Sequence, residues 1–476
     1  MNVLFLQNFW HEHLGTMCLS GALKAAGHTA SVGIGSSFED FKERIGLFRP
    51  GLIAFSSTSG EHLWAIEVAR QIKKDHGIPV VMGGPHPTYM PDVIEEESID
   101  FICVGEGEEA MVELASDLEK GGSGEGVRNI FTRSQRFDRA LIRPLVQDLD
   151  ALPMPDRSLY YDEYPFIHDN PVKHFMAGRG CVFDCSFCYN HQWKELYEGK
   201  GRVLRYHSPS YCIEEILRVK ERYPLGLVVF EDDTFTANKK WLAEFLTEYR
   251  SRVKVPFACN VFATTVTEET ARLLAEAGCY RVNMGVESGN ERLRKELLNK
   301  NVSDESIIRA ARLLRERKIR LLTNNMLGLP GETLKEAYST VELNIRIKTD
   351  YPWCSILQPY PKTRIAEYVK KCPQSGDGQD CQFKGTFFEA SVIDQPDMDK
   401  IINLQKLFYL TVKAPFLFPL VKVLIRLPLR WLYHGIFLVT FAYRYMRCHK
   451  MTLWQMTVFS FRNKRLYGRS RSARKS

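Results

Sequence analysis

Short apolar runs alternate with amphipathic stretches over the first 120 residues of the chain. The apolar runs lie at 3–7, 51–57, 78–84 and 100–105. Stretches with helical spacing of apolar positions lie at 15–27, 61–75 and 108–120. The runs are too continuous for a sheet with one solvated face, so the pattern predicts an α/β, Rossmann-like, doubly wound domain with a parallel sheet. Ligands of such a domain bind at the carboxyl ends of its strands.

A second alternation of apolar runs and helical stretches begins near residue 173. Its apolar runs lie at 173–180, 225–233, 255–261, 281–288, 319–330 and 353–360. Most are followed by a helical pattern, for example at 303–318 and 333–348. Six strands with intervening helices predict a partial (βα)6 barrel rather than a complete eight-fold one.

The segments between these patterns divide the chain. The sequence GGSGEG at 121–126 indicates a turn or a flexible linker. The segment 141–172 carries several prolines and indicates an irregular connector. We therefore predict four parts: a first domain, a connector, a barrel and a C-terminal helical region, at 1–140, 141–172, 173–360 and 361–476.

Composition and charge sharpen this division. The 476 residues are 45% hydrophobic and 25% charged, which is typical of a globular protein of two or three domains. After Asp399 the chain has no acidic residue, whereas residues 400–476 contain 16 Lys and Arg. Residues 1–399 carry a net charge of −9. Such polarity predicts an acidic body and a basic tail with different partners.

The first residues and the cysteines indicate the compartment. The start MNVLFLQNFWHEH has neither a basic n-region nor a small-residue cleavage site, so we expect a cytoplasmic protein. In a reducing compartment, 12 cysteines indicate metal or redox ligands rather than a disulfide framework.

The strongest chemical signal is a group of three cysteines directly after the first barrel strand. Cys181, Cys185 and Cys188 follow the spacing CxxxCxxC. Thiolates on one loop can bind three irons of a 4Fe-4S cluster and leave the fourth iron open for a ligand. The alternative is a zinc site with His191 or Cys212 as fourth ligand, although the spacing departs from the usual zinc patterns.

At these residues the chain resembles the radical S-adenosylmethionine (SAM) superfamily. That family's loop has an aromatic residue just before the third cysteine, here Phe187, and the resemblance covers residues 173–360. It implies that the open iron binds SAM and that one-electron reduction yields a 5′-deoxyadenosyl radical. It also implies an electron donor such as flavodoxin or ferredoxin.

Three further strand ends match the family in the expected order. The resemblance implies acceptors for the methionine ammonium of SAM at Glu231, Asp232 and Asp233. It implies contacts with the ribose and the methionine carboxylate at Glu287 and Ser288, and an adenine contact at Pro330. Taken singly, these motifs have plainer explanations: a helix cap, a strand-to-helix turn and an ordinary turn.

The first domain resembles the cobalamin-binding module often fused ahead of this barrel. The residues that carry this resemblance follow three strands: Ser56, Ser57, Thr58, Gly83, Gly84, Gly105 and Glu106. The glycines are expected to permit close approach of a bulky ligand. The cobalt-ligating DxHxxG pattern is absent, so His11 or His13 as a cobalt ligand stays an open alternative. An empty Rossmann-like adaptor is the other alternative.

The tail combines apolar bulk with basic residues over 416–447. Its longest stretch without Lys or Arg is 13 residues, against the roughly 20 that a membrane span requires. With Lys422, Arg426, Arg430, Arg444 and Arg447, the segment is typical of an interfacial helix on anionic lipid. RNA binding and a buried helical lid over the barrel are the alternatives.

These observations together predict a cobalamin-dependent radical SAM enzyme that methylates an unactivated carbon of an apolar, lipid or isoprenoid-like substrate. The expected cofactors are a 4Fe-4S cluster, SAM and cobalamin, and the expected partners are the substrate and an anionic membrane surface, with nucleic acid disfavoured. The location is expected to be cytoplasmic and peripheral to the membrane. Alternatives are an oxidative cyclase or rearrangement enzyme, an RNA-modifying enzyme and a noncatalytic cobalamin sensor.

Overall fold

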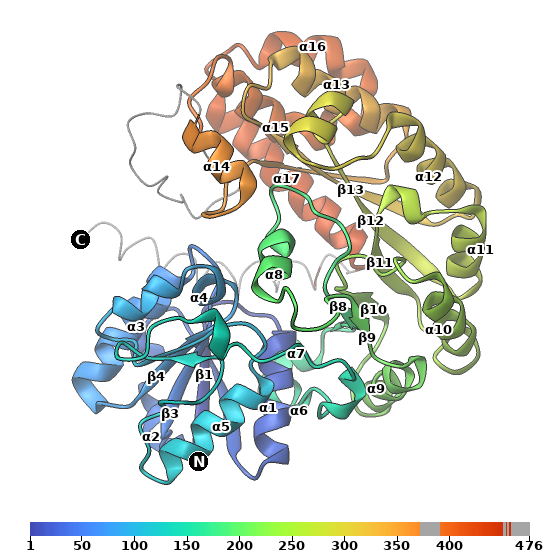
Figure 1. Ribbon diagram of the computed structural model, residues 1–476. Coiled ribbons are helices and arrows are strands. Elements are labelled where there is room, and N and C mark those ends of the chain that lie inside the picture. Colours follow the sequence, from blue (N-terminus) through green and yellow to red (C-terminus); the bar gives the residue numbers. More distant parts are fainter. Residues whose placement is uncertain (372–390, 451–453, 455–456, 458–476) are drawn as a thin grey trace.

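The first domain is a sheet with helices on both faces, as predicted, and it has six strands where the sequence indicated four (Figure 1). The computed structural model describes residues 1–371, 391–450, 454 and 457. In spatial order the strands are β2 (Thr29–Ile34), β1 (Asn2–Gln7), β3 (Leu52–Ser56), β4 (Val80–Gly83), β5 (Phe101–Cys103) and β6 (Ile130–Phe131). All pairs are parallel except that of β5 with β6.

Burial on both faces explains the continuous apolar runs. In β1, Val3 and Phe5 belong to one hydrophobic cluster, whereas Leu4 and Leu6 belong to another. The helices of this domain are α1 (Leu14–Ala25), α2 (Lys42–Phe48), α3 (His62–His76), α4 (Pro85–Tyr89) and α5 (Glu108–Glu119). The pattern missed β2, whose first residue is exposed and whose sequence includes Ser and Gly, because an edge strand shows weaker periodicity.

The segment 121–126 is a turn within this domain, and its interpretation as a flexible linker is wrong. The backbone N–H of Gly124 donates to the Asp117 carboxylate at 2.7 Å. A side chain at Gly124 would meet the Phe101 ring at 2.6 Å. The chain then enters β6, so the turn joins two elements of one fold.

The connector packs against the first domain. It contains α6 (Ser158–Tyr161) and α7 (Pro165–His168). Tyr160 is fully buried, and its hydroxyl donates to the side chain of Gln7 at 2.6 Å. The connector therefore forms part of the wall between the two large sheets.

The second sheet is a curled, parallel half-barrel of six strands, as predicted. In spatial order they are β14 (Tyr351–Ile356), β13 (Arg320–Leu327), β12 (Cys279–Glu287), β11 (Phe257–Val261), β10 (Leu227–Phe230) and β7 (Val172–Phe175). A short ribbon of β8 (Gly178–Arg179) and β9 (Arg205–Tyr206) lies beside them.

Helices line the outer rim of this half-barrel, and Figure 1 shows α10 to α13 there. The helices that follow the barrel strands are α9 (Pro209–Arg222), α10 (Lys239–Arg252), α11 (Glu268–Glu276), α12 (Asp304–Glu316) and α13 (Leu334–Arg346). Two further helices, α8 (Asn190–Leu196) and α14 (Arg364–Lys371), follow the cysteine loop and the last strand.

The register identifies which residues face the concave side. Asn260 pairs with Asn283, and Asn283 pairs with Leu322, which pairs with Tyr351. Paired residues of parallel strands point to the same face. Leu322 and Tyr351 form a buried cluster with Cys448 of the C-terminal helix. The C-terminal helix therefore lies on the concave face, inside the curl of the sheet (Figure 1).

The described tail consists of α15 (Met398–Lys413), α16 (Phe418–Leu424) and α17 (Arg430–Cys448). Helix α15 packs against β14 and α13, and α17 packs against α15. For α17 the structure thus has the buried helical lid, and the lipid-facing assignment of Arg444 is wrong because Arg444 is 8% exposed. The most basic stretch, 462–476, lies outside the described residues.

Within the described part of the chain, no helix is both long and apolar enough to cross a bilayer.

Candidate functional site

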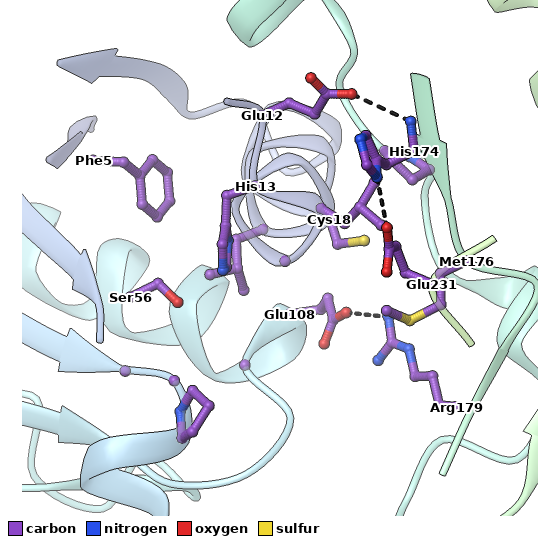
Figure 2. A pocket seen from close by; sticks show the side chains of 18 of the residues that line it. Phe5, Glu12, His13, Cys18, Ser56, Glu108, His174, Met176, Arg179 and Glu231 are labelled. Atoms are coloured by element: carbon purple, nitrogen blue, oxygen red, sulfur yellow. Dashed lines mark hydrogen bonds and ion pairs between the residues drawn. The ribbon is translucent and has the colours of Figure 1, made fainter. Parts of the chain in front are cut away.

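A cavity of about 960 Å³ lies between the two domains (Figure 2). The first domain contributes the loops after β1, β3, β4 and β5, which are carboxyl ends of strands. The second contributes β7, the end of β10 and the C-terminal helix. The cavity thus joins the predicted cobalamin edge to the mouth of the half-barrel.

Five of the seven residues predicted to bind cobalamin line this cavity: Ser56, Gly83, Gly84, Gly105 and Glu106. The other two do not. Ser57 is buried, and the Thr58 hydroxyl donates to Glu61 at 2.6 Å at the start of α3. Their assignment to cobalamin stays a prediction.

Two of these glycines are required by the protein itself. A Cβ at Gly84 would lie 2.9 Å from the backbone nitrogen of Ser57, and one at Gly105 would lie 2.0 Å from the Tyr197 hydroxyl. Both residues also have positive φ. Our expectation that these glycines make room for a ligand is therefore incomplete. At Gly83 the nearest atom would be 3.5 Å away, so that position alone of the three is open to a side chain.

The two histidines considered as cobalt ligands lie in the loop after β1 and line the cavity. Burial lowers the pKa of both His11 and His13 to about 4, so both are neutral at pH 7. His13 is the N-cap of α1, and its Nδ1 accepts from the Thr16 backbone N–H at 3.1 Å. This bond leaves the ring proton on Nε2, which then has no free lone pair for a metal.

The cysteine loop follows β8 and is fixed at both ends by stacked rings. Phe183 stacks on Phe262 with ring centroids 3.5 Å apart. Tyr189 stacks on Tyr89 of the first domain at 4.1 Å, which links the loop directly to the cobalamin side. No local sequence pattern indicates this second stack, because it joins residues 100 positions apart.

The three thiols fit a cluster by their chemistry. Burial raises the pKa of Cys181, Cys185 and Cys188, that of Cys185 to about 12. A thiolate here would be desolvated without compensation, and bound iron cations would supply that compensation. Their assignment as cluster ligands stays a prediction.

Neither His191 nor Cys212, the residues considered as fourth ligand of a zinc site, is grouped with the three thiols in the described residues. The Nδ1 of His191 faces the Cys188 carbonyl at 2.6 Å, and Cys212 lies on the buried face of α9. No group of three His, Cys, Asp or Glu in the described residues is arranged to hold one metal ion.

The three acidic residues after β10 have different surroundings. The Glu231 carboxylate accepts from His174 Nδ1 at 2.6 Å. Asp232 is buried and accepts from the Ala177 backbone N–H at 3.0 Å, and burial raises its pKa to about 7. Asp233 lines the cavity beside the cysteine loop. Of the three, Asp233 has the surroundings that best fit an ammonium group of SAM, and all three assignments stay predictions.

The remaining predicted SAM residues do not line the cavity. Glu287 forms an ion pair with Lys300 at 2.9 Å, and both charges act on the pKa of Cys185. Ser288 is fully buried, and its hydroxyl accepts from the Asn290 N–H. Phe187 packs against a hydrophobic cluster, and Pro330 is buried. Phe187 belongs to the cysteine loop itself, whereas Ser288 and Pro330 follow strands β12 and β13.

The cavity walls carry charged pairs that the sequence did not indicate. The Arg157 guanidinium donates to Glu215 at 2.6 Å. Arg179 pairs with Glu106 and Glu108, as Figure 2 shows for Glu108. Partners separated by some 60 to 70 positions leave no local pattern, so only the fold could bring them together.

The barrel end of the cavity is also polar. His174 and Glu231 lie there, joined by the bond drawn in Figure 2. Helix α17 and the turn after it add Tyr445 and His449. The tail therefore contributes directly to the site.

Two family models match the chain. The model described as "Radical SAM superfamily" matches residues 176–343. The model described as "B12 binding domain" matches residues 7–115.

Several known proteins are similar to this chain in sequence or in fold. An uncharacterized methyltransferase of Pyrococcus horikoshii is 30% identical over 339 residues, 70% of this chain and 72% of the relative. An anaerobic magnesium-protoporphyrin IX monomethyl ester cyclase of Rubrivivax gelatinosus is 24% identical, over 85% of this chain and 74% of the relative. The fold resembles that of the radical SAM methyltransferase TsrM of Kitasatospora setae, solved with cobalamin and a 4Fe-4S cluster. That match has a TM-score of 0.65 at 18% identity and covers 82% of this chain and 83% of that one.

Proposed function

Because this chain belongs to the radical SAM superfamily and carries an N-terminal B12 binding domain, we propose that it methylates an unactivated carbon. The observation that carries the proposal is the single cavity between the two domains. It is lined by the cobalamin edge of one sheet and by Gly180 and Asn190, the residues on either side of the cysteine loop of the other. In this arrangement a substrate carbon can approach both cofactors.

The residues of the chain have separate tasks in this proposal. Bound there, the cluster and SAM supply a hydrogen-abstracting radical and cobalamin supplies a methyl group. The three cysteines hold the cluster, and Asp233 orients the ammonium group of SAM. The Tyr89–Tyr189 stack keeps the cysteine loop at a fixed distance from the cobalamin edge. Positioning of this kind is the main contribution that a protein makes to cofactor chemistry.

Oxidative cyclisation without methyl transfer is the second candidate. The Rubrivivax cyclase aligns over 85% of this chain, against 70% for the Pyrococcus methyltransferase. The cyclase alignment is therefore the longer one, although its identity is lower.

The substrate we propose is apolar in its greater part and is reached from a membrane surface. Exposed apolar residues on α16 and on either side of it support this: Phe416, Leu420, Val423 and Leu427. Leu420 and Val423, three positions apart, lie on the same face of α16. Lys422, Arg426 and Arg430 lie beside them, so anionic headgroups would complement the patch.

The test uses the full chain, reconstituted anaerobically with iron, sulfide and cobalamin. It is incubated with a one-electron reductant such as reduced flavodoxin or ferredoxin, with SAM labelled in the methyl group and with a cell lipid extract. Methyl transfer predicts a labelled lipid product by mass spectrometry, whereas cyclisation predicts a loss of hydrogen without label. A triple Cys181, Cys185 and Cys188→Ala variant is expected to abolish cluster absorbance and SAM cleavage.

Two further variants complete the experiment. Cys212→Ala removes a buried cysteine away from the loop and is expected to keep the full iron content. Gly83→Leu fills the open position at the cobalamin edge and is expected to weaken cobalamin uptake at least tenfold, about 1.4 kcal/mol. Full cobalamin uptake by this variant, or full iron content in the triple variant, would contradict the assignments.

A further inference from the structure

Two buried arginines on the barrel have no carboxylate partner. Arg281 of β12 is 3% exposed and Arg444 of α17 is 8% exposed. Among the described residues neither forms an ion pair, and the Nε atom of each has no hydrogen-bond partner. Buried charges in proteins are normally paired, because an unpaired one loses its hydration without compensation.

Both arginines belong to the concave face. Arg281 lies two residues before Asn283 on β12, so its side chain points to the same side. The Arg444 guanidinium lies over the Trp353 ring at 4.2 Å. Trp353 pairs in register with Asn324, two residues after Leu322, on the face that α17 covers.

Hydrogen bonds across three strands hold Arg281 in place. Its guanidinium donates to Asn283, whose amide donates to Asn260 at 2.8 Å. The Asn260 amide in turn donates to the Asp232 carbonyl at 2.8 Å. A charge fixed by a network but not neutralised is arranged for a ligand rather than for stability.

The neighbouring groups do not neutralise the two charges. Glu231 is close enough to Arg281 to interact electrostatically, but its carboxylate is bound to His174. Burial, together with the charge of Arg281, lowers the pKa of His449 to about 3, so this ring is neutral. Burial and the charge of Arg281 also lower the pKa of Arg444. The described surroundings therefore leave a net positive charge inside the barrel.

We propose that an oxyanionic group of the substrate, a carboxylate or a phosphate, binds between Arg281 and Arg444 under helix α17. Because His449 lies beside both arginines and also lines the cavity between the domains, the body of the substrate extends from this anion toward that cavity. The identification of the bound anion as part of a substrate rests on the proposed function. It implies that the substrate is an amphiphile, with an anionic group and an apolar body.

The binding test needs no turnover. Thermal unfolding of the reconstituted full chain is followed in sodium chloride, in inorganic phosphate and in hexyl phosphate at equal ionic strength. Both phosphates are expected to raise the Tm, and hexyl phosphate to do so at a concentration at least tenfold lower because its chain occupies the cavity. Arg281→Met and Arg444→Met are expected to abolish both shifts.

The same variants separate a ligand site from a structural role. In chloride, removal of an unpaired buried charge is expected to raise the Tm of each variant by about 2–4 °C. Arg294→Met is the matched control: Arg294 is fully buried on the same barrel but donates to Asp304 and to two carbonyls, so its loss lowers the Tm. If Arg281→Met and Arg444→Met behave like Arg294→Met and keep the phosphate shift, the proposal fails.

The remaining outcomes are equally decisive. No Tm shift of the wild type with either phosphate overturns the anion site. A shift with inorganic phosphate but no gain from the hexyl chain overturns the substrate assignment and leaves a site for a free ion. The thermal unfolding experiment contains no SAM. Its Tm shifts therefore do not depend on whether methyl transfer is detected in the labelled-SAM experiment, and the two proposals can fail separately.

Discussion

Arginines are buried both at the boundary between the two domains and on the concave face of the barrel. Only those at the boundary have carboxylate partners among the described residues. At the boundary, Arg157 meets Glu215, and Arg205 donates to Glu106 at 2.8 Å. On the concave face, Arg281 and Arg444 have no such partner among the described residues. The two regions are similarly buried, so burial alone does not explain the contrast.

The presence or absence of a carboxylate partner distinguishes charges that stabilise the fold from charges that we assign to ligand binding. A buried pair holds two segments in a defined orientation, because loss of either partner leaves the other charge uncompensated. The Arg157–Glu215 pair joins the connector to α9 in this way. An unpaired arginine destabilises the fold by itself, so its position is explained by what binds there.

The largest effect that tests this contrast is expected at the boundary. Arg157→Met removes the guanidinium from Glu215, from the His174 carbonyl and from the face of the Phe175 ring. It leaves a buried carboxylate without a partner, so we expect the free energy of unfolding to fall by about 3–5 kcal/mol. Chemical denaturation of the full chain measures this loss.

The double variant Arg157→Met with Glu215→Leu provides the control. It removes both charges and is expected to recover most of the lost stability. If the double variant is as unstable as the single one, the loss of stability does not come from the uncompensated Glu215 carboxylate. Arg157 and Arg281 would then not differ in the way proposed.

Much of the fold was accessible from the sequence, and the reason is the length of the apolar runs. Strands buried on two faces, such as β1 and β4, gave continuous patterns, and the helices of the barrel gave clear 3.6-residue spacing. The two-residue β6 gave no pattern. The role of α17 was also not accessible, because a helix with basic residues beside apolar ones looks the same whether it covers lipid or a sheet.

The site divides in the same way. The cysteine loop and the strand ends were accessible because their residues are adjacent in sequence. His174 was not, since a single polar residue in an apolar run does not reveal that Glu231 lies opposite it. Arg281 and Arg444 were hidden for a related reason: the signal is a missing partner, which only the packed structure can establish.

A smaller effect is expected from a buried carboxyl group near the end of β13. The Glu332 side chain accepts from the Gly328 N–H at 2.6 Å, while its other oxygen has no partner among the described residues. Burial raises the pKa of Glu332 from 4.5 to about 8. The folded state thus keeps a proton that the unfolded state releases, and stability is expected to fall by up to about 1.4 kcal/mol per pH unit between these values.

Unfolding free energies measured from pH 5 to pH 8 check this slope. Glu332→Gln keeps an oxygen acceptor for Gly328 but cannot ionise, so the contribution of residue 332 to the slope should vanish. Equal slopes in the variant and the wild type would show that this buried group is compensated after all. It would then belong with the paired charges of the domain boundary.

The smallest effect concerns the outer surface of the tail, where the contrast is between side chains that pack and side chains that do not. Cys448 of α17 is buried against the concave face, whereas Phe416 before α16 is 81% exposed and Trp431 at the start of α17 is 75% exposed. Interfacial burial of such side chains contributes about 1.5–3 kcal/mol each when complete, and an interface buries them only in part. The double variant Phe416→Ser with Trp431→Ser is therefore expected to reduce binding to anionic liposomes about tenfold, or about 1.4 kcal/mol.

Leu47→Ser is the matched control, because Leu47 is 78% exposed on the first domain, and it should float with liposomes like the wild type. Salt should weaken wild-type flotation, since the basic residues beside the patch act through screened charges. If neutral liposomes bind the wild type as well as anionic ones, or the control loses as much binding as the double variant, the patch is not the membrane contact.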